Sequence, residues 1–161
     1  MRIAIFGNSG SGKSTFARCL AARHGLPMLE LDSIVWEPAK IAVVRPKENI
    51  LGDFETFLAS HQCWVVEGCY GELVEVVLSR CTDVYFLNPG LAVCLDNNRR
   101  RSWEPHKYES PDAQDAMLAG LLAWVEGYYT RDDQWSLSYH RRLFEAYTGK
   151  KAELTGLPVE G

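Results

Sequence analysis

The residues of this sequence whose types and spacing indicate chemistry most clearly form a glycine-rich loop near its start. Residues 7–14 follow the pattern Gly-x4-Gly-Lys-Ser, which is typical of a phosphate-binding loop when a strand precedes it and a helix follows it. Glycines allow positive φ angles, so successive backbone N–H groups can point at phosphate oxygens. The Lys13 ammonium can reach the β- and γ-phosphates of a nucleotide, and the Ser14 hydroxyl can bind Mg²⁺ held between them. The residues predicted to hold these phosphates are Gly7, Asn8, Ser9, Gly10, Ser11, Gly12, Lys13, Ser14 and Thr15.

Strands and helices alternate in the pattern that surrounds this loop. Residues 1–6 form a short apolar run with β-branched side chains, and residues 13–24 carry apolar side chains at helical spacing before Gly25. Further strands are predicted at 27–31, 63–66 and 83–87, with a final edge strand at 151–155. Helices are predicted from Pro46 onward and at 70–80, 91–101, 110–129 and 135–147, whereas 33–46 is predicted to be a loop. This alternation predicts an α/β fold with a parallel sheet covered on both faces and ligands bound beyond the carboxyl ends of its strands.

Two carboxylates follow predicted strands and should therefore lie near the glycine-rich loop. Asp32 comes at the end of the second strand and Glu67 at the end of the third. A carboxylate in such a place can hold a Mg²⁺-bound water or accept a proton from an attacking hydroxyl. The alternatives are that Asp32 caps a turn at residues 33–35 and that Glu67 is a surface carboxylate before the turn at Gly68.

A run of three arginines, Arg99, Arg100 and Arg101, lies near the end of a predicted helix. Basic side chains are favourable there because they face the negative end of the helix dipole. The functional interpretation is that one or two of them close over the triphosphate as part of a lid at residues 99–110 and stabilise the transferring phosphoryl group. Adjacent helical residues point about 100° apart, so all three cannot face one site, and Arg99 or Arg101 is favoured.

Aromatic side chains near the expected cleft fall into two groups. Trp64 and Trp124 lie on apolar stripes and are predicted to be core, whereas Trp36 and Trp103 lie in polar segments. The latter two could stack on a flat ligand or could be ordinary packing residues. His106, between a proline and a lysine, is a candidate for binding the acceptor or a phosphate.

Composition limits the class of protein. A chain of 161 residues is expected to form one domain over 1–161, and a net charge of −4 argues against a broad nucleic-acid surface. The five cysteines contain no Cys-x-x-Cys pair, which suits reduced thiols and argues against a zinc site. No apolar run approaches the roughly 18 residues that span a bilayer, and residues 1–3 lead into a strand rather than a signal peptide. We therefore expect a cytoplasmic protein without a membrane partner.

The loop, the acid that ends the second strand and the Glu67-Gly68 turn together resemble the small P-loop kinases of the adenylate, shikimate and gluconate kinase type. Within that group, residues 31–36 and 64–70 resemble the bacterial subgroup called topology modulation protein. Residues 103–108 resemble a stretch of kinase-like proteins of uncertain function. The resemblance implies a three-layer P-loop NTPase fold with a five-stranded parallel sheet in the order 2-3-1-4-5. It also implies ATP and Mg²⁺ as cofactors and an arginine-bearing lid after the fourth strand.

The chain also departs from these kinases at two places. The Asp-x-Asp pair of shikimate kinases is absent, because Glu30 only partly replaces its first member. The Pro-Arg that follows the turn in adenylate kinases is absent too, and residues 69–71 are Cys-Tyr-Gly. Neither shikimate nor a nucleoside monophosphate is therefore supported as the phosphoryl acceptor.

The sequence thus leads to the hypothesis of an ATP- and Mg²⁺-dependent phosphotransferase that acts on a small molecule. In this hypothesis Ser14 and Glu67 hold the metal, and either Asp32 or Glu67 receives the acceptor proton. The expected catalytic residues are Lys13, Asp32, Glu67, Arg99 and Arg101. The alternatives are a regulatory or nucleic-acid-linked NTPase without a small-molecule acceptor and a nucleotide-binding protein without chemistry.

Overall fold

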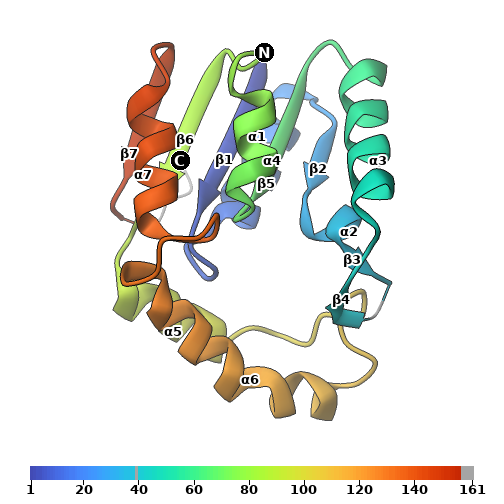
Figure 1. Cartoon of the computed structure of the whole chain (residues 1–161), viewed down its shortest axis with the longest axis vertical. Coiled ribbons are helices and arrows are strands. Elements are labelled where there is room, and N and C mark those ends of the chain that lie inside the picture. The colour runs from blue at the N-terminus through green and yellow to red at the C-terminus, as the bar shows by residue number, and fades with distance from the viewer. Residues whose placement is uncertain (39, 157–161) are drawn as a thin grey trace.

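A five-stranded parallel sheet organises the computed structural model, which describes residues 1–38 and 40–156 (Figure 1). Its strands lie in the order β2-β5-β1-β6-β7. Numbered within this sheet alone, that is the order 2-3-1-4-5 that the resemblance implies. The strands are β1 (Arg2–Gly7), β2 (Met28–Glu30), β5 (Trp64–Gly68), β6 (Asp83–Leu87) and β7 (Lys150–Leu154).

The central strand β1 is buried on both faces, which explains its continuous apolar sequence. Successive side chains of a strand point to opposite faces. Accordingly, Phe6 packs in one core cluster with side chains of α3 (Lys47–Ser60), α4 (Gly71–Leu78) and α7 (Leu137–Ala146). Ile3 and Ile5 pack in the other cluster with Ala17 and Ala21 of α1 (Lys13–His24). The sheet therefore has helices on both faces, as predicted.

Helices cover the sheet and also extend beyond the carboxyl ends of its strands. In Figure 1, α5 and α6 lie below the end of the sheet at which β1 finishes. Within the described residues, no helix combines the length and the apolar character needed to cross a membrane. The helices are α1 (Lys13–His24), α3 (Lys47–Ser60), α4 (Gly71–Leu78), α5 (Leu91–Arg99), α6 (Pro111–Glu126) with a following 3-10 turn (Gly127–Tyr129), and α7 (Leu137–Ala146).

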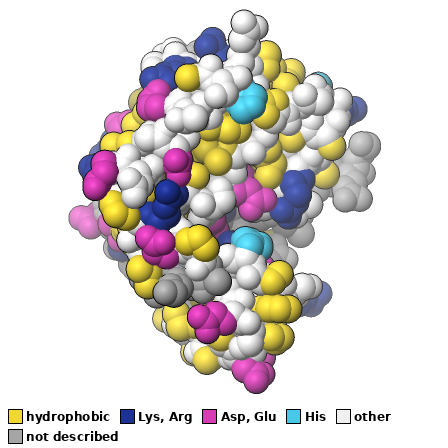
Figure 2. Space-filling model, turned by 90° about the vertical axis from the view of Figure 1, so that its right-hand side faces the viewer, with side chains coloured by type: hydrophobic (Ala, Val, Ile, Leu, Met, Phe, Trp, Pro, Cys, Tyr) yellow, Lys and Arg dark blue, Asp and Glu magenta, His cyan; other side chains and the backbone are white. Residues whose placement is uncertain are grey.

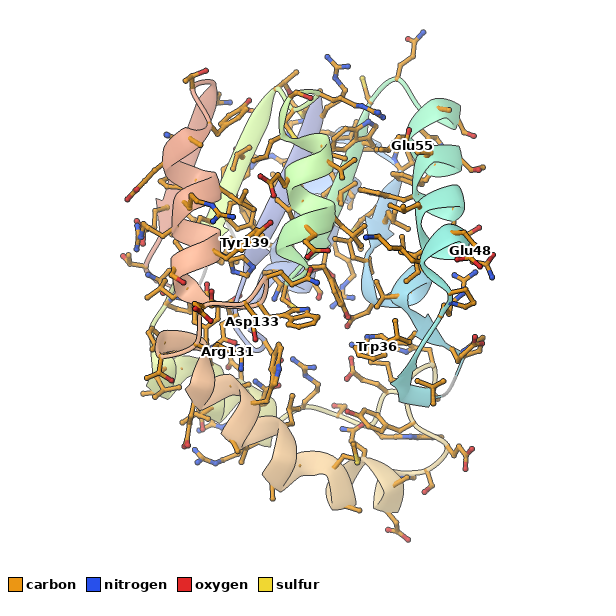
Figure 3. All side chains as sticks on the ribbon, in the orientation of Figure 1. Trp36, Glu48, Glu55, Arg131, Asp133 and Tyr139 are labelled. Atoms are coloured by element: carbon orange, nitrogen blue, oxygen red, sulfur yellow. The ribbon has the colours of Figure 1, made fainter. Side chains whose placement is uncertain are left out.

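The prediction of a loop over residues 33–46 was wrong. This segment contains the short helix α2 (Asp32–Val35) and the strands β3 (Trp36–Glu37) and β4 (Lys40–Val44), which form a separate antiparallel pair. The pair is short and irregular, with a register shift after Trp36, so its sequence shows no sustained alternation of apolar and polar residues. Figure 3 shows Trp36 pointing from this hairpin toward the middle of the molecule.

A buried histidine connects the core to the end of β5. His140 of α7 is fully buried, with Nε2 3.0 Å from the Cys69 carbonyl oxygen and Nδ1 2.9 Å from the Tyr128 hydroxyl. Because a carbonyl only accepts, Nε2 donates its proton to Cys69, and the Nδ1 of a neutral ring then accepts from Tyr128. Burial lowers the pKa of His140 to about 3, so the imidazole stays neutral.

We expect this histidine to make the fold less stable in mild acid. Between its unfolded pKa of about 6.5 and its folded pKa of about 3, the unfolded chain binds a proton that the folded chain does not. The contribution of His140 to the free energy of unfolding is therefore fully present above pH 6.5. It decreases as the pH falls, and about 2 kcal/mol of it is lost at pH 5. Urea unfolding at pH 7 and pH 5 should show a smaller pH dependence for His140→Gln than for the parent. Equal pH dependence in both proteins would contradict this assignment.

Candidate active site

A cleft of about 1040 Å³ opens where the phosphate-binding loop and the ends of β2 and β5 face the segment after α5. In Figure 2 the outline of the molecule is indented on its right side, between a larger upper part and a smaller lower part. The sequence-predicted site residues that line this cleft are Ser9, Gly10, Gly12, Lys13, Ser14, Thr15, Asp32, Glu67, Arg101 and His106. Segments far apart in the sequence thus bring most of the predicted residues to one place.

The glycine-rich loop has a backbone that only glycine fits at one of its central positions. Gly10 has a φ of 77°, and a Cβ atom built there would lie 2.3 Å from the carbonyl oxygen of Cys94 in α5. Gly12, with a φ of 92°, precedes α1 and provides no side-chain cap. The first N–H groups of α1 are therefore free to bind an anion such as phosphate.

Two asparagines of α5 hold the glycine-rich loop by hydrogen bonds. Asn97 donates its side-chain N–H to the Gly10 carbonyl oxygen at 2.8 Å, and the Ser9 hydroxyl donates to Asn98 Oδ1 at 3.1 Å. The sequence analysis missed both asparagines. No motif marks them, because their function depends on a contact between segments that are distant in the chain.

Lys13 lies inside the loop rather than in solvent. Its side chain is 8% exposed, and Nζ donates a hydrogen bond to the Asn8 carbonyl oxygen at 2.8 Å. This contact curls the lysine back over the loop. The ammonium is therefore held against the backbone of the loop, in a residue that lines the cleft.

Ser14 and Glu67 place two oxygen atoms that could act as metal ligands beside Lys13. The Ser14 hydroxyl donates to Glu67 Oε1 at 2.9 Å, and Glu67 is buried at the end of β5. Burial raises the pKa of the Glu67 carboxyl, while the nearby Lys13 charge acts in the opposite direction. Hard oxygen donors are the ligands that Mg²⁺ prefers. The two residues therefore fit the metal that the sequence predicts.

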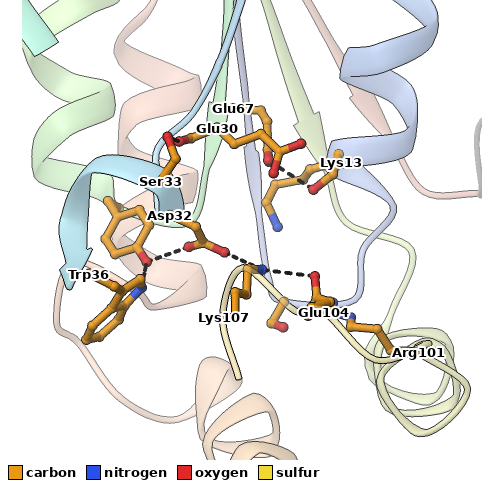
Figure 4. Close-up of polar contacts among 12 residues, drawn as sticks. Lys13, Glu30, Asp32, Ser33, Trp36, Glu67, Arg101, Glu104 and Lys107 are labelled. Atoms are coloured by element: carbon orange, nitrogen blue, oxygen red, sulfur yellow. Dashed lines mark hydrogen bonds and ion pairs between the residues drawn. The ribbon is translucent and has the colours of Figure 1, made fainter. Parts of the chain in front are cut away.

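Asp32 takes part in a separate polar network, drawn in Figure 4. Its Oδ1 accepts a hydrogen bond from the Tyr70 hydroxyl at 2.5 Å, and its Oδ2 lies 2.7 Å from Lys107 Nζ, which also lies 3.2 Å from Glu104 Oε1. Burial alone would raise the pKa of the Asp32 carboxyl, but the Lys107 ammonium and the Tyr70 hydroxyl hold it below its usual range. Asp32, the first residue of α2, thus presents an ionised carboxylate to the cleft. The helix has no side-chain cap hydrogen bond, so Asp32 does not cap it.

The sequence analysis did not single out Tyr70 or Lys107. Both lie in the stretches 64–70 and 103–108 that carry the resemblance, and this was the available signal. Trp36, a candidate for ligand stacking, instead donates its indole N–H to the Tyr70 hydroxyl at 2.6 Å. Trp103 is 44% exposed and donates to a nearby carbonyl oxygen. In the part of the chain that the structure describes, neither Trp36 nor Trp103 lines the cleft.

The three arginines take different positions from those that helical spacing suggests. Arg101 lines the cleft and lies 3.4 Å from Glu104, and Arg100 also lines the cleft while paired with Asp96 at 3.0 Å. Arg99 is exposed and does not line it. Arg100 is still in right-handed helical conformation, with its N–H bonded to the Asp96 carbonyl oxygen. The chain leaves the helix after it, so the spacing of about 100° no longer determines the position of Arg101.

Comparison with solved structures identifies the fold. A sugar kinase from Janibacter sp. matches 99% of this chain and 86% of its own, with 15% identity and a TM-score of 0.52. A gluconokinase from Sinorhizobium meliloti matches 82% and 97%, with 19% identity and a TM-score of 0.48. A shikimate kinase from Acinetobacter baumannii matches 88% and 90%, with 19% identity and a TM-score of 0.42. No model of a protein family and no curated protein matches the sequence.

The sheet order and the glycine-rich loop, together with the match to the Janibacter structure, define a three-layer P-loop NTPase fold. At these levels of identity the likeness establishes the fold. The ligands of this chain depend on the residues that line its own cleft.

Proposed function

We propose that this protein transfers the γ-phosphoryl group of ATP, bound with Mg²⁺, to a hydroxyl group of a small molecule. The observation that carries the proposal is that one cleft holds two distinct carboxylate sites. Glu67 is hydrogen-bonded to Ser14 beside the phosphate-binding lysine, whereas Asp32 lies in a different hydrogen-bond network with Tyr70 and Lys107. A carboxylate next to the nucleotide site but outside the metal pair can serve the acceptor.

On the nucleotide side, the loop residues 7–15 would hold the phosphates and Lys13 would contact the β- and γ-phosphates. Mg²⁺, held through Ser14 and Glu67, would neutralise phosphate charge as the reaction proceeds. Lys13 is already buried against the loop. It would therefore need only to exchange the Asn8 carbonyl for a phosphate oxygen.

On the acceptor side, Asp32 would receive the proton of the attacking hydroxyl at Oδ2, the oxygen that faces Lys107. The acceptor oxygen forms a bond to the γ-phosphorus, and the bond from that phosphorus to the bridging oxygen breaks. The electron pair of the broken bond stays on the bridging oxygen, which leaves as part of ADP. Asp32 then returns its proton to solvent.

The segment 99–110 would act as the lid of a single domain that extends over 1–161, of which 157–161 lie outside the described residues. Arg101 lines the cleft already and is our first candidate for stabilising the transferring phosphoryl group. Arg99 remains a second candidate that would require the segment to rearrange. In this proposal Lys107 leaves Asp32 when the acceptor arrives.

The acceptor is proposed to be a small polar compound that offers a hydroxyl group. A hydroxyl group can donate a hydrogen bond to the ionised Asp32 carboxylate, which accepts only. The Janibacter protein is named a sugar kinase, which is compatible with an acceptor of this chemistry. The stretches 31–36 and 64–70 of the topology modulation resemblance supply Asp32, Trp36 and Tyr70, so this network would be the part of the site that the subgroup shares.

The test is a panel of hydroxyl-bearing metabolites incubated with the protein, ATP and Mg²⁺ while ADP release is recorded. The expected result is ADP release that depends on one class of acceptor, with a product whose mass is increased by one phosphoryl group. Acceptor-independent or DNA-stimulated hydrolysis would instead favour a regulatory NTPase. Tight ATP binding without turnover would favour a protein that only binds nucleotide.

A further inference from the structure

Tyr70 holds Asp32 and is not among the described residues that line the cleft. It is 4% exposed and lies in the connection between β5 and α4, and its hydroxyl donates to Asp32 Oδ1 at 2.5 Å. The same hydroxyl accepts the indole N–H of Trp36, from β3, at 2.6 Å. Three segments of the chain thus meet at one buried phenol.

The direction of both hydrogen bonds is fixed by chemistry. An indole N–H can only donate, so the Tyr70 oxygen accepts from Trp36 and has one proton left to donate. Burial, first of all, raises the pKa of Tyr70 far above its ordinary value, so the phenol keeps that proton. Asp32 Oδ1 is therefore the acceptor of a bond that cannot reverse.

The two oxygens of Asp32 consequently have different surroundings. Oδ1 is held by Tyr70, which lies outside the cleft lining, whereas Oδ2 is held by Lys107, which lines the cleft and comes from the segment after α5. A ligand that enters the cleft can replace the ammonium of Lys107 without disturbing the phenol. Only Oδ2 is then available to a hydroxyl group.

Resting on the proposed function, we propose that Tyr70, held by Trp36, is a positioning residue that fixes Oδ1 of Asp32 and leaves Oδ2 as the oxygen that meets the acceptor. Without the phenol hydroxyl, the carboxylate could rotate about its side-chain bonds and present either oxygen. Correct placement of a reacting group contributes strongly to rate. The role of Tyr70 is therefore exerted through Asp32 and not through contact with the substrate.

The charges around Asp32 determine how the loss of the hydroxyl will act. Lys107 from the segment after α5 and Lys13 from α1 favour the ionised carboxylate. Glu67 from β5 is close enough for Asp32 to raise its pKa, so by reciprocity it disfavours ionisation of Asp32, as burial does. Removing the Tyr70 proton removes one of the groups that favour ionisation. The pKa of Asp32 should therefore rise, and a base that must be ionised should stop working at a higher pH.

The first measurement needs no acceptor. Protein labelled with ¹³C at the aspartate carboxyl groups is titrated by NMR, with the Asp32 signal assigned from the spectrum of Asp32→Asn. Tyr70→Phe, which keeps the ring, should move the Asp32 midpoint upward, and Trp36→Phe should move it in the same direction by less. Tyr129→Phe, which removes a phenol hydroxyl at an exposed position, should leave it unchanged. An unmoved midpoint in folded Tyr70→Phe would overturn the proposal, and Trp36→Phe provides the test if Tyr70→Phe does not fold.

The second measurement uses turnover of Mg²⁺–ATP, with water or an identified acceptor as the second substrate. Tyr70→Phe should lower kcat by about tenfold or more, because a hydrogen bond to a charged group is lost, and should leave the KM for ATP unchanged. The acidic limb of its pH profile should move to higher pH. If the parent turns over and Tyr70→Phe has the same kcat and profile, this inference alone fails. If the parent shows no turnover under any condition, the proposed function fails and the role of Tyr70 in the reaction fails with it.

Discussion

Replacing Lys13 with alanine should lower ATP-dependent turnover by about 100- to 1000-fold, the usual cost of losing a charge that stabilises a transferring phosphoryl group. The expectation rests on the position of Lys13, which is buried and donates from Nζ to the Asn8 carbonyl oxygen of the glycine-rich loop. Steady-state ADP release at saturating ATP and Mg²⁺ measures the effect. Lys47→Ala, which removes the same side chain from an exposed position in α3, should retain the parental rate.

The same variant has a structural cost that must be separated from the catalytic one. Lys13 is one of two donors to the Asn8 carbonyl oxygen, beside the Ser11 backbone N–H, and the loss of its hydrogen bond should lower the free energy of unfolding by about 1 kcal/mol. Urea unfolding of parent and variant measures this difference. A folded Lys13→Ala protein with a near-parental rate would show that this loop is not the active centre.

The second large effect should separate the two carboxylates. Asp32→Asn keeps the shape of the side chain but cannot take a proton at neutral pH, so kcat at saturating Mg²⁺ should fall by about 100-fold or more. Glu67→Gln removes the charge next to Ser14, so the Mg²⁺ concentration that supports half-maximal turnover should rise. Turnover measured over a range of Mg²⁺ concentrations at saturating ATP gives both kcat and the Mg²⁺ concentration for half-maximal turnover.

Glu48→Gln is the matched control for this pair, because Glu48 is an exposed carboxylate in the first turn of α3. It should change neither kcat nor the Mg²⁺ requirement. The reverse pattern, with a metal effect from Asp32 and an acceptor effect from Glu67, would exchange the two roles. If neither substitution had an effect, both residues would be removed from the site.

Local patterns account for the parts of the fold that the sequence predicts well. The glycine-rich loop and the buried strands are encoded by residues close together in the chain, and β7 is confirmed despite its charged sequence. Its charges suit an edge strand, since Glu153 pairs with Arg141 at 2.6 Å and Lys150 with Asp83 at 2.7 Å. The hairpin of β3 and β4 was missed because it is too short to show a period.

Contacts between distant segments account for what the sequence does not show. Asp32 is identifiable from the strand before it, but the groups that hold it come from a turn 38 residues later and from the segment after α5. Tyr70 and Lys107 carry no motif of their own. Likewise, the exposure of Arg99 depends on where α5 ends, and the ends of helices are the least certain part of a prediction.

Helix α5 connects the two sides of the cleft, so binding on one side can affect binding on the other. At its carboxyl end, Asn97 and Asn98 hold the glycine-rich loop, and the chain then runs directly into the segment whose Lys107 contacts Asp32. In the proposed function, this one connector would serve both the nucleotide and the acceptor. By linkage, whatever factor a bound nucleotide applies to the affinity for acceptor, a bound acceptor must apply to the affinity for nucleotide. Two binding isotherms, each recorded with and without the other ligand, must give the same coupling free energy.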